Sequence, residues 1–206
     1  MRKGISKVVL QRLPIYLNYL KELPDKSKYI SATVLAEKLD LGQVQVRKDL
    51  ASVSKSGKPK VGYEIGTLIA ELEGALGYNE VYQAVIVGAG RLGKALLDYK
   101  GFADYGLNIA AGFDKNPDVR GETEGGKGIY GMDDMPTIVQ EQGVRIGIIT
   151  VPSACAQDAC DKLVECGIKA IWNFSAAHLT VPTEVLVKNE NMAISLSLLA
   201  KHLANK

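Results

Sequence analysis

The stretch Val85–Leu96, VIVGAGRLGKAL, constrains the fold more than any other part of the sequence, because an apolar run leads into three glycines at fixed spacing. The pattern predicts a buried strand, a tight turn at Gly88 and a helix, as in the first unit of a dinucleotide-binding domain. In such a unit Gly90 lets the backbone approach a pyrophosphate, and Gly93 allows close packing of the helix on the strand. The helix N-terminus at Arg91 would offer unpaired N–H groups to the phosphates.

This motif is a weak signal alone, and the segment that follows it gives it weight. Residues 107–113, LNIAAGF, read as a second strand that ends in Asp114, 21 residues after Gly93. An acidic residue at that place accepts hydrogen bonds from both hydroxyls of an adenosine ribose and repels a 2′-phosphate, so it favours NAD(H) over NADP(H). Two observations oppose this interpretation: the neighbouring Lys115 is basic, and Asp114 is also the first residue of a turn-forming Asp-Lys-Asn-Pro run.

Later segments alternate between strand and helix, as expected for a doubly wound parallel sheet of the Rossmann type in an α/β protein. They are a strand at 145–153, a helix at 154–166 and a strand at 168–174. Ligands of such sheets bind at the carboxyl ends of the strands. We therefore expect dinucleotide contacts from Thr150, Val151 and Pro152, and also from Asn173 and Phe174. The glycine-rich segment 121–131 is predicted to be a mobile loop.

Charge is divided unevenly along the chain. Residues 1–63 contain 13 Lys and Arg against 5 Asp and Glu, a net charge of +8, whereas the rest of the chain contains 12 against 18, a net charge of −6. A basic module joined to an acidic one indicates that the first module binds a polyanion, and nucleic acid is the partner we expect. The alternative is a basic face that is only solvated.

The basic segment has the apolar spacing of short helices. Residues 8–23 carry apolar side chains three and four positions apart, and Pro14 is expected to disturb this helix locally. Ser31 offers an N-cap to a second helix, and residues 40–42, Asp-Leu-Gly, form a turn. A third helix at 43–55 is predicted to direct four side chains toward the core: Val44, Val46, Leu50 and Val53. Two helices joined by such a turn are typical of a helix-turn-helix, whose second helix enters the major groove.

Side chains at the start of that third helix suit base recognition. Gln and Arg pair with adenine and guanine edges, whereas Lys suits a phosphate. The run Gly-Lys-Pro-Lys at 57–60 is predicted to be the tip of a β-hairpin wing that adds further DNA contacts. The DNA-contacting residues that we predict are Ser31, Gln43, Gln45, Arg47, Lys48, Lys55, Lys58, Lys60 and Tyr63. The alternative is an ordinary surface helix and loop.

The sequence offers few groups for catalysis by a dinucleotide-dependent enzyme, because it has no Tyr-x-x-x-Lys pair. His178 follows a strand end, and we expect it to cap or pack rather than to catalyse. Cys155, Cys160 and Cys166 match no common zinc spacing, so no metal site is expected; we interpret them as small apolar residues, with a redox-active thiol as the alternative. The chain shows no secretory signal and no apolar run long enough to span a membrane, so we expect a reducing, cytoplasmic location.

Six segments form a joint pattern along the chain: QVRKDL at 45–50, GKPKVGY at 57–63, VGAGRLGKAL at 87–96, DYKGF at 98–102, TVPS at 150–153 and IWNFS at 171–175. This pattern resembles the Rex family of NADH-responsive bacterial transcriptional repressors, over nearly the whole chain. The resemblance implies a winged-helix DNA reader, a Rossmann sensor of the NADH/NAD⁺ ratio and a homodimer on a palindromic operator. It also implies a C-terminal helix exchanged between subunits. Our hypothesis is that NADH closes the homodimer and releases the operator.

The dinucleotide-contacting residues that we predict are Gly88, Ala89, Gly90, Arg91, Leu92, Gly93, Tyr99, Asp114, Lys115, Thr150, Val151, Pro152 and Met192. We expect Tyr99, Val151, Pro152 and the partner's Met192 to line an apolar niche, which admits a neutral reduced nicotinamide ring more readily than a cationic oxidised one. The chain departs from the family in one respect. Family members often carry an acidic residue followed by Phe at the start of the last helix and an Arg in the first helix, where this chain has Asn191, Met192 and Asn18. If charge pairing between domains uses those positions, neutral hydrogen bonds must replace it here.

The segment Asn191–Leu203 is apolar around most of its circumference, which predicts partners on more than one side. It either docks on its own sheet or forms a two-fold contact in a dimer. We expect three parts in the chain: a winged-helix domain at 1–78, a Rossmann domain at 79–190 and a dimerisation helix at 191–206. A helix at 65–76, ended by Gly77, is expected to link the first two parts. Two other functions stay open: a small NAD-dependent oxidoreductase with a basic appendage, and a DNA-binding protein with a degenerate nucleotide fold.

Overall fold

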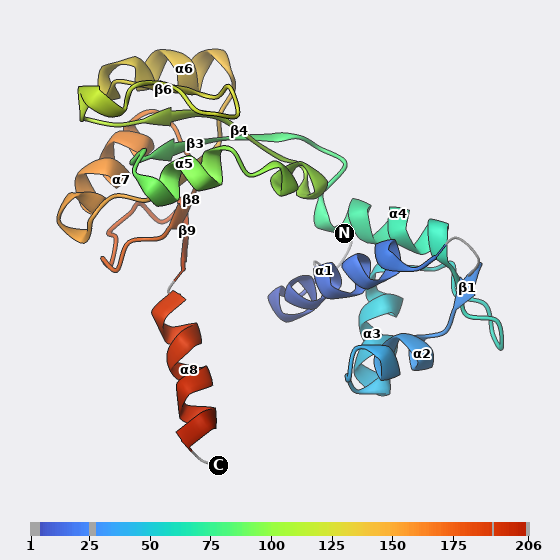
Figure 1. The fold of residues 1–206 in the computed structure, drawn as a ribbon. Helices are drawn as coiled ribbons and strands as arrows, with labels where there is room; N and C mark the ends of the chain where they lie inside the picture. Colours follow the sequence, from blue (N-terminus) through green and yellow to red (C-terminus); the bar gives the residue numbers. More distant parts are fainter. Residues whose placement is uncertain (1–4, 25–27, 191, 205–206) are drawn as a thin grey trace. The chain divides into compact units, whose positions relative to one another are not determined.

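The computed structural model describes residues 5–24, 28–190 and 192–204 of the chain (Figure 1). The chain divides into two compact units, Met1–Glu80 and Val81–Lys206. Each unit has its own hydrophobic core. Within the described ranges, no helix is long and apolar enough to cross a membrane.

The first unit packs helices around one core. Its elements are α1 (Lys7–Glu22), β1 (Tyr29–Ile30), α2 (Ala32–Lys38), α3 (Gln43–Val53), β2 (Tyr63–Glu64) and α4 (Ile65–Leu76). Pro14 does not end α1, which continues through it to Glu22, and the local disturbance predicted there stays a prediction. The inward side chains of α1 are buried in the core, and this packing offsets the loss of the one backbone hydrogen bond that a proline cannot donate. These side chains are Leu13, Tyr16, Leu17 and Leu20.

The predicted helix-turn-helix is present in this unit. Ser31 caps α2, with its hydroxyl oxygen accepting from the backbone N–H of Val34 at 3.1 Å. Asp40 adopts a left-handed conformation, with φ of 52°, and turns the chain into α3. One predicted core residue is wrong: Val44 is 66% exposed, whereas Val46 and Leu50 are fully buried. The buried stripe of α3 includes Asp49 instead, because Asp49 has partners on α1.

The predicted wing is shorter than a regular hairpin. Lys58 and Gly62 form a single antiparallel bridge, with N–H to O distances of 2.8 and 2.9 Å. After this tip the chain pairs with β1 rather than with the residues before the tip, since β2 and β1 form a two-stranded antiparallel sheet. The tip therefore projects from the sheet as a tight turn, with Lys60 in a left-handed conformation at φ 62°.

The second unit contains a seven-stranded sheet in the order β5-β6-β4-β3-β7-β8-β9, as counted over the described residues. The strands are β3 (Tyr82–Val87), β4 (Leu107–Phe113), β5 (Gly121–Glu122), β6 (Gly128–Tyr130), β7 (Ile146–Ile149), β8 (Ala170–Asn173) and β9 (Leu186–Asn189). All neighbours run parallel except β5 and β6, which confirms a Rossmann-like, mainly parallel sheet. The mobile loop predicted at 121–131 is wrong, because that segment forms β5 and β6 and adds them to the edge of the sheet.

Helices cover both faces of this sheet. They are α5 (Arg91–Leu97), α6 (Met135–Glu141) and α7 (Ala156–Glu165), with the short 3₁₀ helices η1 (Lys100–Tyr105), η2 (Pro117–Val119), η3 (Met132–Asp134) and η4 (Ser153–Cys155). Successive residues of β3 point to opposite faces. Val85 and Val87 pack in the core under α6 and α7, whereas Ala84 and Ile86 pack in the core under α5 and η1.

Among its described side chains, the C-terminal helix α8 (Met192–Ala204) carries the large exposed apolar residues Ile194, Leu196 and Leu203. Asn191 and the side chain of Met192, which the sequence analysis singled out, lie outside the described residues. The exchange of this helix between subunits stays a prediction.

Candidate functional site

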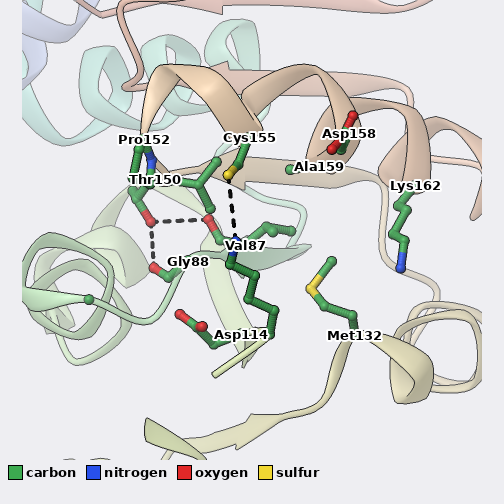
Figure 2. Close-up of a pocket in the computed structure, with 13 residues that line it drawn as sticks. Val87, Gly88, Asp114, Met132, Thr150, Pro152, Cys155, Asp158, Ala159 and Lys162 are labelled. Carbon is green, nitrogen blue, oxygen red and sulfur yellow. Dashed lines mark hydrogen bonds between the residues drawn. The ribbon is translucent and has the colours of Figure 1, made fainter. Parts of the chain in front are cut away.

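A cavity of about 380 Å³ lies at the carboxyl ends of β3, β4 and β7, where a doubly wound sheet binds its ligand (Figure 2). Its walls are mainly apolar, with Asp114 and Lys115 on one side and Asp158 and Lys162 on the opposite side. The lining residues are Val87, Gly88, Gly90, Asp114, Lys115, Met132, Thr150, Val151, Pro152, Cys155, Asp158, Ala159 and Lys162.

The glycine turn forms one wall, and its three glycines meet different constraints. Gly88 has φ of 101°, and a Cβ atom there would lie 2.8 Å from Cγ1 of Val151. A Cβ atom on Gly93 would overlap the carbonyl oxygen of Gly88, which confirms that Gly93 permits close helix packing. A Cβ atom on Gly90 would meet nothing within 4 Å. The turn therefore needs glycine at Gly88 and Gly93 for its own packing, and Gly90 leaves its space open toward a ligand.

Thr150 fixes the glycine turn to the end of β7. Its hydroxyl lies 2.6 Å from the carbonyl oxygen of Gly88 and 3.2 Å from that of Val87, and Figure 2 shows both contacts. The hydroxyl donates its proton to these carbonyls and so ties the glycine turn to the residue that follows β7. Thr150, Val151 and Pro152, for which dinucleotide contacts are predicted, all line the cavity, and the contacts themselves stay a prediction.

Asp114 is held by two backbone N–H groups. Its Oδ2 accepts from Ala89 at 2.7 Å, and its Oδ1 accepts from Asn116 at 2.8 Å. The second contact is the turn that the sequence analysis gave as an alternative, and the first ties β4 to the glycine turn. Each carboxylate oxygen can accept a further hydrogen bond, so this oriented carboxylate can still receive two hydroxyl groups of a ribose.

The opposite wall of the cavity was missed by the sequence analysis. Figure 2 shows Cys155, Asp158, Ala159 and Lys162 along α7, facing Asp114 and Met132 across the hollow. Cys155 is the last residue of η4 and the N-cap of α7, and its Sγ is 3.7 Å from Nζ of Lys115. These residues are spaced three, four and seven positions apart on the helix predicted at 154–166, so they share one face. This spacing is the sequence feature from which the second wall of the cavity could have been predicted.

Several predicted cofactor residues do not line the cavity. Ala89 is buried and contributes only its backbone N–H, which binds Asp114. Tyr99 is 59% exposed, and its ring packs edge-on against Phe102 at 4.9 Å between centroids. The others that do not appear in the wall are Arg91, Leu92, Gly93, Asn173 and Phe174. The side-chain amide of Asn173 instead bonds to Ala177 and Asn189, and the ring of Phe174 packs on Trp172. The predicted residues that do line the cavity are Gly88, Gly90, Asp114, Lys115, Thr150, Val151 and Pro152.

The predicted base-reading side chains lie on the outer surface of α3. Gln43, Gln45, Arg47 and Lys48 are all exposed. The wing lysines Lys55, Lys58 and Lys60 are also exposed. Tyr63 is half-buried, because its ring packs against Gly57 at the base of the wing. Ser31 is engaged as the cap of α2.

A buried carboxylate fixes α3 to α1. Asp49 accepts from Nε and Nη2 of Arg12 at 2.7 and 2.8 Å, and from the hydroxyl of Tyr16 at 2.8 Å. Burial alone raises the pKa of Asp49, but these hydrogen bonds and the charge of Arg12 lower it below its ordinary value. Burial also raises the pKa of Tyr16, and Asp49 raises it further. No local sequence pattern predicts this contact, because Tyr16 and Arg12 precede Asp49 by 33 and 37 residues.

The groups considered for catalysis do not form a site. His178 is exposed and does not line the cavity. Burial raises the pKa values of the Cys160 and Cys166 thiols, as expected for structural residues. Among the described residues, no group of three His, Cys, Asp or Glu side chains could hold a metal ion.

Comparison with known proteins finds similarity in both units. Residues 79–177 match the family model described as CoA binding domain, and residues 4–51 match the model described as putative DNA-binding protein N-terminus. A Treponema denticola protein described as redox-sensing transcriptional repressor Rex is 44% identical over 191 residues, which cover 92% of this chain and 91% of that protein.

Solved structures show the same similarity. The crystal structure of RSP in complex with β-NAD⁺ and operator DNA has a TM-score of 0.91 at 34% identity, and the match covers 98% of this chain and 93% of RSP. The crystal structure of RSP in complex with β-NADH has a TM-score of 0.87 at 34% identity, covering 98% of this chain and 95% of RSP. The likeness therefore extends over both units.

Proposed function

Because the chain belongs to the Rex family of redox-sensing transcriptional repressors, we propose that its first unit binds an operator and its second unit senses the NADH/NAD⁺ ratio. In this proposal the dinucleotide is an effector, and the chain catalyses no reaction on it. The relatives are repressors rather than enzymes. The domain boundaries proposed from the sequence assign DNA binding to residues 1–78, NAD(H) binding to residues 79–190 and dimerisation to residues 191–206.

The sensor half of this proposal is carried by Asp114. Two backbone N–H groups orient its carboxylate at the cavity wall, and its remaining lone pairs suit the two hydroxyls of an adenosine ribose. Gly90 gives a pyrophosphate room to approach the backbone. A negative charge at Asp114 repels a 2′-phosphate, so NADH is preferred to NADPH. Lys115 points to Cys155 rather than to Asp114, and so leaves this negative charge without a partner cation among the described contacts.

The apolar residues of the cavity supply the redox discrimination. Oxidised nicotinamide carries a positive charge and reduced nicotinamide does not. Val151 and Pro152 offer no negative charge to a bound ring, so transfer of the cationic ring from water to this wall is costly. The neutral ring incurs no such cost. We propose that Tyr99 and the partner's Met192 complete this niche in the dimer.

The DNA-binding half uses α3 and the wing. Gln43, Gln45 and Arg47 are placed to pair with base edges, and Lys48 and the wing lysines are placed to contact phosphates. A homodimer would bring two such helices to half-sites about 34 Å apart on a palindromic operator. NADH closes the homodimer and moves these helices out of register, because it binds the closed state more tightly than the open one. Such a repressor acts on DNA in the cytoplasm.

The decisive experiment is an operator-release titration. A palindromic duplex is first selected from a random library by the protein, and its fluorescence anisotropy is then followed as NADH or NAD⁺ is added. Release by NADH at a concentration at least about tenfold below that of NAD⁺ is expected, because the two ligands must differ in affinity to act as a switch. Release by both at the same concentration contradicts the redox sensing. Turnover of NADH with a small alcohol or hydroxy acid would instead indicate an oxidoreductase.

A further inference from the structure

Val44 is an exposed apolar residue on the helix assigned to DNA reading. It is 66% exposed at the second position of α3, although the apolar spacing of the sequence predicts a core position. A solvent-exposed valine contributes nothing to the core of the first unit. Its position therefore has to be explained by the surface around it.

That surface is a basic stripe along α3. Val44, Arg47, Lys48 and Ala51 are spaced three, four and seven residues apart, so they share one face of the helix, and all four are exposed. The helix has no acidic residue in its first turn. Its one carboxylate, Asp49, lies on the opposite, buried face and is held by Arg12. The stripe thus combines two cations and one branched apolar side chain with no exposed negative charge.

We propose that Val44 is a specificity-determining residue that contacts the C5 methyl group of a thymine in each operator half-site. This inference rests on the proposed DNA-binding function. The thymine methyl is the apolar group that the major groove presents on its base edges, and small apolar side chains recognise it by contact. The N-terminal residues of a recognition helix reach base edges, and Val44 lies in the first turn of α3, between Gln43 and Gln45. A phosphate contact from Lys48 and a base-edge contact from Arg47 would bring the same face of the helix into the groove.

A protein partner is a weaker explanation of the same surface. The centres of protein interfaces are depleted of charged residues, and Lys is depleted in particular. Here the apolar side chain lies one helical turn from Arg47 and Lys48, so any surface that covers it must also neutralise two cations. DNA meets both requirements, because its base edges can cover Val44 and its phosphates can neutralise the two cations.

The test removes one methyl group at a time from the DNA. The duplex selected by the wild-type protein is resynthesised with each thymine replaced in turn by deoxyuridine, which lacks only the C5 methyl. Wild-type affinity is expected to fall roughly threefold to tenfold at one position of each half-site, as for the loss of one buried methyl contact. Val44→Ala is expected to bind the parent duplex as weakly as the wild type binds that deoxyuridine duplex, and to lose its sensitivity to the replacement.

A matched control is Val34→Ala, which truncates a 43% exposed valine on α2. It is expected to retain the wild-type response to every deoxyuridine. Thermal melting checks that both variants fold like the wild type. The inference is overturned if no deoxyuridine weakens binding of the wild type, or if Val44→Ala keeps the wild-type sensitivity to the replacement. Either result leaves the proposed DNA-binding function intact. Failure of the wild type to select any duplex removes the proposed DNA-binding function, and the inference with it.

Discussion

Arg12 and Asp49 form a two-pronged ion pair that joins α1 to α3, with N to O distances of 2.7 and 2.8 Å. Asp49 is 4% exposed and also accepts a hydrogen bond from Tyr16. The pair fixes the rotation of α3 about its axis, because it anchors the middle of the helix on the side opposite Arg47 and Lys48. The direction in which the exposed side chains of α3 point, including those proposed to read DNA, thus depends on a contact on the buried side of the helix.

Asp49→Ala is expected to lower both the stability of the first unit and its affinity for DNA. The substitution leaves the buried hydroxyl of Tyr16 and the guanidinium of Arg12 without their acceptor, and a buried group left unpaired costs about 1–3 kcal/mol. Urea unfolding and operator anisotropy measure the two effects. Glu37→Ala, on the exposed surface of α2, is the matched control and should change neither by more than about 0.5 kcal/mol. Equal behaviour of the two variants would show that the ion pair does not position α3.

The stability of the first unit is expected to decrease in acid. The pKa of Asp49 is lower in the folded protein than its ordinary value, so its contribution is present above about pH 4, the pKa of an unfolded aspartate, and is lost as the pH falls through the folded value. Asp49→Asn cannot titrate. The difference in unfolding free energy between wild type and Asp49→Asn should therefore be constant from pH 7 to about pH 5 and shrink below pH 4. Urea titrations at pH 7, 4 and 3 check this, and a difference that does not change with pH contradicts it.

Gly90→Ala and Gly93→Ala are expected to act on different properties. A Cβ atom at position 90 would enter open space on the ligand side, so the fold should be unaffected and NADH binding should weaken at least tenfold. A Cβ atom at position 93 would overlap the carbonyl oxygen of Gly88, so Gly93→Ala should lower the melting temperature even without ligand. Thermal melting and NADH fluorescence separate the two. A fully active Gly90→Ala variant would exclude close approach of a pyrophosphate at Gly90.

Asp114→Ser is expected to reverse the preference between NADH and NADPH. The substitution removes the negative charge that repels a 2′-phosphate and leaves Lys115 nearby, so NADPH affinity should rise while NADH affinity falls roughly tenfold or more. Fluorescence of the bound reduced dinucleotides measures both. Asp118→Asn, an exposed position in η2, is the control that removes a charge without touching the cavity wall. An unchanged ratio of the two affinities in Asp114→Ser would exclude the ribose role.

Lys48→Ala is expected to lose affinity for every DNA sequence, whereas Gln45→Ala is expected to lose discrimination between sequences. A phosphate contact from Lys48 supplies affinity without sequence information, so Lys48→Ala should weaken binding to all duplexes and reduce the salt dependence by about one released ion. A base contact from Gln45 supplies discrimination, so Gln45→Ala should relax specificity at one base pair with little change in salt dependence. Binding isotherms at several salt concentrations on matched and mismatched duplexes measure both, and the reverse pattern would exchange the two assignments.

The sequence by itself determined the local features whose causes are local. The spacing of Gly88, Gly90 and Gly93 fixes the turn, because the backbone angle at Gly88 and the helix contact at Gly93 exclude side chains. The helix Ile65–Leu76 and its end at Gly77 agree with the prediction, since Gly77 adopts the left-handed conformation that ends helices. The strand that leads to Asp114 was also readable, because buried parallel strands are continuous apolar runs.

Only the tertiary structure decided the features that depend on distant partners. The glycine-rich segment 121–131 forms β5 and β6 because β4 offers an edge to pair with, and no local pattern encodes that edge. The wall of α7 faces Asp114 because the sheet order places β7 beside β3. Val44 points to solvent and Asp49 to the core because Arg12, 37 residues before Asp49, sets the rotation of α3. Periodicity marks which residues of a helix share a face, but the free energy of packing and ion pairing with other elements chooses which face is buried.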